Sequence, residues 1–168
     1  MSMDSLLVSD TMSTDVKKVT AEQNMMAACK IMHDHKIGCV VIVELGDAGM
    51  KPVGIITERD IVRILGELEP WLNEMPLRNM MSKPVITIEP TASLKKAMDK
   101  MNTNDIRRLI VVESDNRMIG IITEKDIFRQ IAKSGDLVAN LLGTNYPPEH
   151  KEIYERFGDF MSDLLPKL

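Results

Sequence analysis

Aromatic side chains are scarce in this chain: one Trp, two Tyr and three Phe stand among 168 residues, against fourteen Met. The core must therefore be built from aliphatic and methionine side chains, which adapt their shape easily. Two cysteines are too few for a disulfide framework and fit a reducing compartment. No apolar run approaches the length of a membrane span, and residues 1–10 lack the pattern of a secretory leader. We expect a cytoplasmic protein with no membrane segment.

Strong charge and catalytic motifs are also lacking. The formal net charge is −4, and the basic residues are spread among acidic ones, which disfavours nucleic acid as a partner. The sequence contains no G-x-S-x-G, Walker A or H-E-x-x-H pattern. We therefore predict that the chain is not an enzyme and carries no cofactor.

What the chain does contain is one twelve-residue segment that occurs twice. Residues 54–65 read Gly-Ile-Ile-Thr-Glu-Arg-Asp-Ile-Val-Arg-Ile-Leu, and residues 120–131 read Gly-Ile-Ile-Thr-Glu-Lys-Asp-Ile-Phe-Arg-Gln-Ile, with eight of twelve positions identical. Such similarity within a short chain indicates a duplicated structural unit. Each copy predicts a short buried strand that runs directly into a helix.

A threonine and an aspartate stand three residues apart at each strand–helix junction, Thr57 with Asp60 and Thr123 with Asp126. This spacing fits a capping box, in which the threonine accepts from helical N–H groups and the aspartate reaches back. It also fits a nucleotide site, because a helix N-terminus attracts phosphate and a carboxylate can hold a ribose diol. The motif alone favours the cap, and its duplication strengthens the case for a nucleotide site.

The preceding part of each repeat predicts a strand, a helix and a second strand. Short β candidates at 16–19 and 85–88 precede helices with an apolar stripe at helical spacing, and the continuous aliphatic runs 40–43 and 109–112 follow. Runs without alternation are typical of a sheet covered on both faces. The order β-α-β-β-α in each repeat predicts a mixed α/β (α+β) fold.

We divide the chain accordingly into a first unit with its N-terminal lead-in at 1–68, a connector at 69–78 that contains Trp71, a second unit at 79–133 and a C-terminal extension at 134–168. Apolar residues of the extension recur at helical spacing. They are Ile153, Phe157, Phe160, Met161 and Leu164. An amphipathic helix here needs a surface to lie on, which can belong to its own protomer, to a dimer mate or to a separate partner.

The doubled unit resembles a tandem pair of CBS domains (cystathionine β-synthase domains), often called a Bateman module. The resemblance rests on Met-Ser before the first strand, on the run 106–112 before the hairpin and on Gly-Ile-Ile-Thr-x-x-Asp after it, and it covers residues 8–132. It implies two units related by a pseudo-twofold axis, with their sheets facing each other and adenosine-type ligands in clefts between them. It further implies a homodimeric, energy-sensing regulatory module that binds AMP, ADP, ATP or S-adenosylmethionine and acts on a protein partner.

In that family the aspartate of the closing motif holds the ribose hydroxyls and the threonine contacts ribose or phosphate. The resemblance therefore assigns these roles to Thr57, Asp60, Thr123 and Asp126. The family also uses first-strand backbone and closing-motif aliphatic residues for the adenine, and basic residues for phosphate. The matching candidates are Val16, Val85, Ile56, Ile122, Arg107, Arg108, Arg59 and Lys125.

The two repeats differ beside the second strand, where Arg107-Arg108 in the second corresponds to Gly38-Cys39 in the first. A guanidinium group suits phosphate, so the two sites should differ in affinity. Arg63 and Arg129, in the closing helices, are interpreted as solvated surface or snorkelling residues, with a role at a dimer interface as the alternative.

Three alternatives remain beside the ligand-binding interpretation. One is a purely structural or protein-interaction module with no physiological nucleotide, and a more remote one is a nucleic-acid-associated regulator. The third is a metal site, for which the spacing of the candidate ligands gives weak support, because both cysteines fall at positions expected in the core. Those candidates are Cys29, His33, His35 and Cys39.

Overall fold

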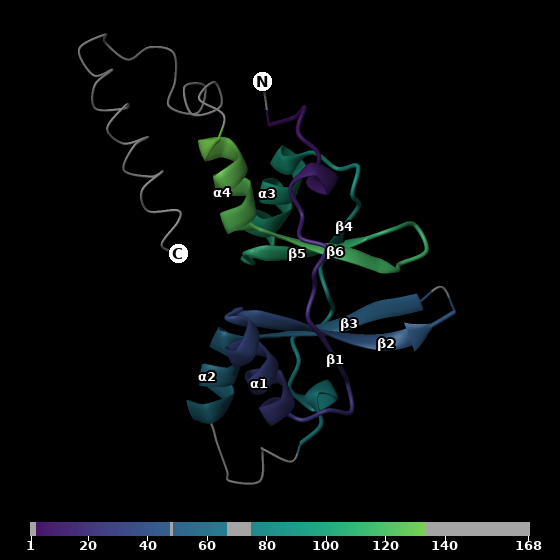
Figure 1. Ribbon diagram of the computed structural model, residues 1–168, viewed down its shortest axis with the longest axis vertical. Helices are drawn as coiled ribbons and strands as arrows, with labels where there is room; N and C mark the ends of the chain where they lie inside the picture. The colour runs from purple at the N-terminus through teal and green to yellow at the C-terminus, as the bar shows by residue number, and fades with distance from the viewer. Residues whose placement is uncertain (1–2, 48, 67–74, 134–168) are drawn as a thin grey trace, which may run out of the picture. The chain divides into compact units, whose positions relative to one another are not determined.

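The computed structural model describes residues 3–47, 49–66 and 75–133. The elements in chain order (Figure 1) are η1 (Val8–Asp10), β1 (Lys18–Thr20), α1 (Met25–His35), β2 (Cys39–Gly46), β3 (Gly49–Thr57), α2 (Glu58–Gly66), η3 (Leu77–Asn79), β4 (Thr87–Ile88), α3 (Leu94–Thr103), β5 (Arg108–Val112), β6 (Met118–Thr123) and α4 (Glu124–Ala132). The predicted order β-α-β-β-α is thus confirmed in both repeats. The predictions for Trp71 and for the C-terminal extension at 134–168 lie outside the described residues. Within the described ranges, no helix is long and apolar enough to cross a membrane.

The chain divides into two compact units that cut across the two repeats. The larger unit contains residues 13–90 and 109–121, and the smaller unit contains residues 1–12, 91–108 and 122–168. The larger unit therefore holds α1, α2 and most of both sheets, whereas the smaller unit holds η1, α3 and α4.

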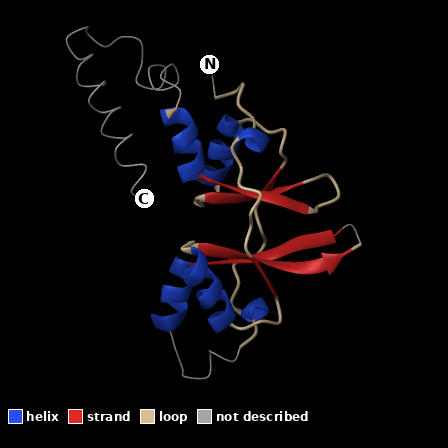
Figure 2. Ribbon diagram, in the orientation of Figure 1, coloured by secondary structure: helices blue, strands red, loops and turns tan. Residues whose placement is uncertain are grey.

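Each repeat contributes a three-stranded sheet, in the order β1-β2-β3 and β4-β5-β6 (Figure 2). In both sheets the first strand runs parallel to the second, and β2 and β3 form an antiparallel hairpin. Pro52 of β3 lies opposite Val43, and the register of the hairpin shifts between Ile42 and Val43. A proline cannot donate to the ladder, so an irregularity at this point is expected.

The aliphatic strand β2 is covered on both faces, as its continuous apolar run predicted. Val40 and Ile42 pack in a cluster with Met25, Ala28 and Met32 of α1. Val41 and Val43 point to the opposite face and pack against residues of the second sheet. Those residues are Ile110, Val112 and Met118. The two sheets therefore face each other across an aliphatic layer within the larger unit.

The first strand of each repeat is shorter than predicted and begins later. Pairing starts at Lys18, opposite Val41, and at Thr87, opposite Ile110. Val16 and Val85, which we expected inside these strands, instead pack against the layer between the sheets. Their apolar character reflects burial in that layer and not a place in the ladder.

The lead-in of each repeat hydrogen-bonds to the other repeat. Ser13 and Ile121 exchange two backbone hydrogen bonds of 2.9 Å, and Ser82 bonds to Ile55 in the same way at 2.9 and 3.1 Å. Leu77 of the second lead-in also donates its N–H to the carbonyl of Gln23 in the first repeat, at 2.8 Å. Two segments that match in sequence, around Met-Ser, therefore have matching places in the fold.

The smaller unit repeats this arrangement around α3. Val8 of η1 donates its N–H to the carbonyl of Ala92, and Leu94 donates to the carbonyl of Leu6, each at 2.9 Å. Ser93 caps α3 by accepting from the N–H of Lys96. The buried side chains of α3 are Leu94, Ala97 and Met101, and those of α4 are Ile127 and Ile131.

Candidate functional site

The predicted capping boxes are present at both strand–helix junctions. In the first, the backbone N–H and the hydroxyl of Thr57 donate to Oδ2 of Asp60 at 2.9 and 2.7 Å, and the N–H of Asp60 donates back to the threonine hydroxyl at 3.3 Å. The second reproduces these bonds between Thr123 and Asp126 at 3.0, 2.6 and 3.3 Å. The cap therefore uses one oxygen of each carboxylate and fixes the direction of the other.

The second oxygen of Asp60 faces groups from both repeats. Its Oδ1 accepts a hydrogen bond of 3.0 Å from the hydroxyl of Ser82, and Nη2 of Arg63 lies 3.8 Å away. The Asp60 side chain is 15% exposed, so it can still reach solvent or a ligand. Ser82 and Arg63 were not among the predicted site residues, although Ser82 stands in the repeated Met-Ser pair.

The second junction has a similar arginine. Nη1 of Arg129 lies 3.9 Å from Oδ1 of Asp126, whose side chain is 22% exposed. Arg63 and Arg129 occupy the same position in the two closing helices. Their side chains are 53% and 42% exposed, in agreement with the predicted surface positions, and the structure also brings each within reach of the carboxylate three residues earlier. The i, i+3 spacing on a helix could have indicated this neighbourhood.

The remaining basic candidates lie at different distances from these junctions. The side chain of Arg107 is 71% exposed, and its Nε lies 4.0 Å from Oε2 of Glu124, directly after Thr123. Arg108 is half-buried as the first residue of β5, and Arg59 and Lys125 are exposed. A phosphate contact from any of these four remains a prediction.

Gly38 is the structural counterpart of Arg107. The N–H of Glu58 donates to the carbonyl of Gly38 at 3.3 Å, just as the N–H of Glu124 donates to that of Arg107 at 3.1 Å. A Cβ atom at Gly38 would lie 3.1 Å from Oε2 of Glu58. In the second repeat, therefore, a cation lies beside Glu124, whereas in the first repeat Glu58 lies beside a glycine.

The aliphatic candidates are fully buried, as the prediction of a buried strand implies. Ile56 and Ile122 have no exposed surface. Their neighbours Ile55 and Ile121 are partly exposed and pack against the layer between the sheets. Because side chains alternate along a strand, Ile56 and Ile122 turn away from that layer. Contact of Ile56 or Ile122 with a base remains a prediction.

The alternative of a metal site finds little support. Among the residues that the structure describes, no group of three or more His, Cys, Asp or Glu side chains could hold a metal ion. His33 and His35 are exposed, and the two cysteines are half-buried and unpaired. Burial raises the pKa of the Cys29 thiol above its usual value, which disfavours the thiolate that a metal needs.

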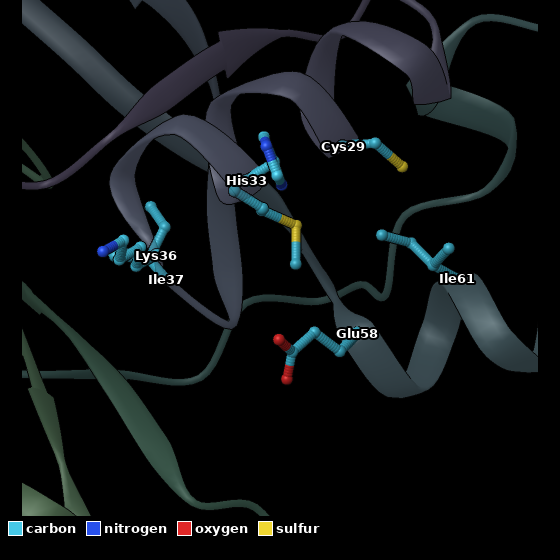
Figure 3. A pocket seen from close by; sticks show the side chains of 7 residues that line it. Cys29, His33, Lys36, Ile37, Glu58 and Ile61 are labelled. Carbon is cyan, nitrogen blue, oxygen red and sulfur yellow. The ribbon is translucent and has the colours of Figure 1, made fainter. Parts of the chain in front are cut away.

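A surface hollow of about 460 Å³ opens between α1 and α2 (Figure 3). Apolar side chains of both helices meet charged ones there. Its lining residues are Cys29, Met32, His33, Lys36, Ile37, Glu58 and Ile61. Nothing in the sequence pattern predicted this hollow, because it depends on the distance between two helices.

Comparison with known proteins now decides the family. The family model of the CBS domain matches residues 8–67 and again residues 77–133. The chain belongs to the CBS domain family. The two CBS repeats make up most of its length, and the capping boxes described above close each of them.

Three similar proteins illustrate the range of the family. An uncharacterised protein of Methanocaldococcus jannaschii, MJ0653, is 37% identical over 156 residues, which is 93% of this chain and 77% of that protein. A homoserine O-acetyltransferase of Methanohalobium evestigatum is 32% identical over 124 residues, 74% of this chain but 24% of the enzyme. The CBS domain pair of protein MJ0100, solved in complex with 5′-methylthioadenosine and S-adenosyl-L-methionine, is 31% identical with a TM-score of 0.65, covering 74% of this chain and 98% of that one.

Several curated relatives are much longer than the CBS pair. This chain spans 63%, 38% and 24% of the length of three of them. A CBS pair thus occurs both in proteins of similar size and as part of larger ones, including an enzyme.

Proposed function

We propose that this chain is a cytoplasmic regulatory CBS pair that binds an adenosine-type ligand, an adenine nucleotide or S-adenosylmethionine, at the Thr57–Asp60 and Thr123–Asp126 junctions. Ligand binding would change the relation between the repeats, and a protein partner would respond to that change. A ligand that bound two arrangements equally would shift neither, so the regulatory ligand must favour one.

The observation that carries this proposal is that the cap occupies one carboxylate oxygen of each aspartate, Oδ2, and leaves Oδ1 to face other groups. The capping box holds Oδ2 and turns Oδ1 of Asp60 toward the Ser82 hydroxyl, a geometry in which a ribose hydroxyl could be accepted instead. Asp126 is held by the same three bonds. The complex of the MJ0100 CBS pair with two adenosine compounds supports the class of ligand.

Replacing Asp60 or Asp126 by alanine should weaken ligand binding, and the two losses should differ. Hydrogen bonds to a charged group contribute about 1.5–3 kcal/mol, so the affected site should lose roughly 10-fold to 150-fold in affinity. Titration calorimetry with AMP, ATP, S-adenosylmethionine and 5′-methylthioadenosine would measure both variants. Equal losses would remove the proposed inequality of the sites.

A matched control separates binding from capping, because either substitution also removes a helix cap. Asn24 caps α1 by accepting from the N–H of Ala27 at 3.1 Å and belongs to neither junction. Asn24→Ala should cost about 1 kcal/mol of stability while leaving the affinity unchanged. Unaltered affinity in both aspartate variants would contradict the proposed site.

A protein-interaction module without a nucleotide is the second candidate, favoured by the exposed apolar side chains of α2. The two functions differ in thermal stability: a ligand at a hundred times its Kd adds about 2.7 kcal/mol to the native state. The absence of a shift with each of the four adenosine compounds would favour the second candidate. Salt-sensitive binding to RNA or DNA would favour the nucleic-acid alternative instead.

We further propose a homodimer with Phe128 of α4 in its interface. Phe128 is 55% exposed, in a chain with few aromatic residues, and buried aromatic residues often dominate interfaces. Phe128→Glu should raise the dimer dissociation constant at least about fivefold, since truncating a residue that contributes strongly to an interface costs more than about 1 kcal/mol. Light scattering after size exclusion would measure it, with Gln130→Glu as the control on the same helix. An unchanged dimer would exclude Phe128 from the interface.

A further inference from the structure

Two oxygen atoms lie side by side at the first strand–helix junction. They are Oδ1 of Asp60 and the hydroxyl oxygen of Ser82, which are 3.0 Å apart and joined by a hydrogen bond; we call them the Asp60–Ser82 pair. An ionised carboxylate has no proton to give, so the serine is the donor. Ser82 is exposed and the Asp60 side chain is partly exposed, so a ligand can reach both. Both residues belong to the larger unit.

The backbone fixes the position of Ser82. Its N–H donates to the carbonyl of Ile55 at 2.9 Å, and its carbonyl accepts from the N–H of Ile55 at 3.1 Å. This close approach depends on Gly54, where a Cβ atom would lie 2.9 Å from Cβ of Met81. Thr57, which holds the other oxygen of the aspartate, follows Ile55 by two positions on β3. One strand therefore positions both members of the pair.

The Asp60–Ser82 pair can accept further hydrogen bonds but has no proton left to donate. An ionised carboxylate offers about four lone-pair positions. Two at Oδ2 are used by the N–H and the hydroxyl of Thr57, and one at Oδ1 is used by Ser82. Nη2 of Arg63, 3.8 Å from Oδ1, is beyond hydrogen-bonding distance. Oδ1 can therefore accept a ligand hydroxyl while it keeps the serine, whose own oxygen can accept a second one.

Two neighbouring acceptors select a ligand that brings two neighbouring donors. The cis hydroxyl groups on C2′ and C3′ of ribose provide such donors on adjacent carbons, at a spacing close to the 3.0 Å of the pair. A phosphate group would bring only acceptors and would be repelled by the charge of Asp60. A site that binds a hydroxyl group through such acceptors discriminates against an analogue without it, because the acceptors then lose their partner.

We propose that Ser82 makes the first junction specific for an intact ribose diol, with one sugar hydroxyl donating to Oδ1 of Asp60 and the other to the oxygen of Ser82. This inference rests on the proposed adenosine site and narrows its ligand. Adenosine compounds that carry their substituent on C5′ keep both donors and are accepted. The 2′-deoxy compounds, the 3′-deoxy compounds and the 3′,5′-cyclic nucleotides are rejected, because each lacks one donor.

Calorimetric titration of the full chain with Asp126→Ala, in which only the first junction keeps its aspartate, tests this role of Ser82. AMP or 5′-methylthioadenosine, whichever binds more tightly, is compared with its 2′-deoxy and 3′-deoxy forms. The form without the hydroxyl that faces Asp60 should bind about 10-fold to 150-fold more weakly, and the form without the other hydroxyl about 2-fold to 10-fold more weakly.

Adding Ser82→Ala should weaken the ribose compound about 2-fold to 10-fold and leave one of the two deoxy forms unchanged, because that form makes no bond to the serine. Ser82→Thr keeps the hydroxyl and should keep the discrimination. Ser114→Ala is the matched control, since Ser114 is an exposed serine in the turn after β5 of the same unit, and it should change no affinity.

Three results with Ser82→Ala would overturn the proposal. An equal loss for all three ligands would mean that the serine only holds Asp60 in place, a gain would mean that it competes with the ligand, and no change would mean that it takes no part. Binding by the unaltered chain but not by the Asp126→Ala chain would overturn this inference and leave the proposed function at the second junction. Absence of binding by both chains would overturn the proposed function as well.

Discussion

Gly54→Ala is expected to lower the free energy of unfolding by about 1–3 kcal/mol, the usual cost of forcing extra atoms into a packed site. A Cβ atom at Gly54 would lie 2.7 Å from Cγ and 2.9 Å from Cβ of Met81. Met81 cannot move away easily, because the next residue, Ser82, is held to Ile55 by two backbone hydrogen bonds. Denaturation in urea, followed by circular dichroism, measures the change.

Gly46→Ala is the control in the same hairpin, since its added Cβ would approach the carbonyl oxygen of Gly49 only to 3.4 Å. It should leave stability nearly unchanged. Adding Met81→Ala to the Gly54→Ala variant removes Cγ and should restore part of the loss, which a double-mutant cycle would detect as coupling. Strictly additive effects would mean that the two residues do not collide.

Leu94→Ala should destabilise the smaller unit by about 2–5 kcal/mol, the range for a leucine removed from a well-packed site. The Leu94 side chain has no exposed surface, and its N–H is bonded to the lead-in at Leu6. The substitution removes apolar contacts and leaves a cavity at the start of α3. Calorimetry would show the lower melting temperature, and hydrogen exchange would show which helices lose protection first.

The neighbouring Lys95 provides the comparison, since its side chain is 60% exposed and its Nζ lies 3.8 Å from Oδ2 of Asp99. Lys95→Ala should change stability by less than about 0.5 kcal/mol. A loss as large as that of Leu94→Ala would show that the position on α3 matters more than burial.

Much of this architecture could be predicted because each repeat provides an independent check on the pattern found in the other. One copy of Thr-x-x-Asp is a common cap, but two copies after matching strands fixed the position of both closing helices. The continuous aliphatic run at Val40–Val43 predicted a sheet covered on both faces, and two separate clusters confirm it. Local patterns were sufficient to predict these strands and helices, because the burial of each element follows the spacing of its own apolar residues.

Contacts between distant segments could not be predicted in the same way. Ser82 reaches Asp60 across 22 positions of sequence, and no spacing rule joins them. The ion-pair partner of Arg107 could not be predicted for the same reason. The sequence identifies Arg107 as a cation, but only the fold brings its Nε to 4.0 Å from Oε2 of Glu124.

The hydrogen bonds of each lead-in to the other repeat bear on how such a protein can be divided. A fragment that ends before residue 67 would keep β3 but lose the bridge from Ser82 to Ile55, and the remaining fragment would lose the bridge from Ser13 to Ile121. Each half on its own would therefore leave these backbone groups without their partners in the other half, although the family model matches each half separately. A single repeat could restore these bonds by exchanging lead-ins with a second molecule. The tandem chain is in this sense a domain-swapped dimer made covalent.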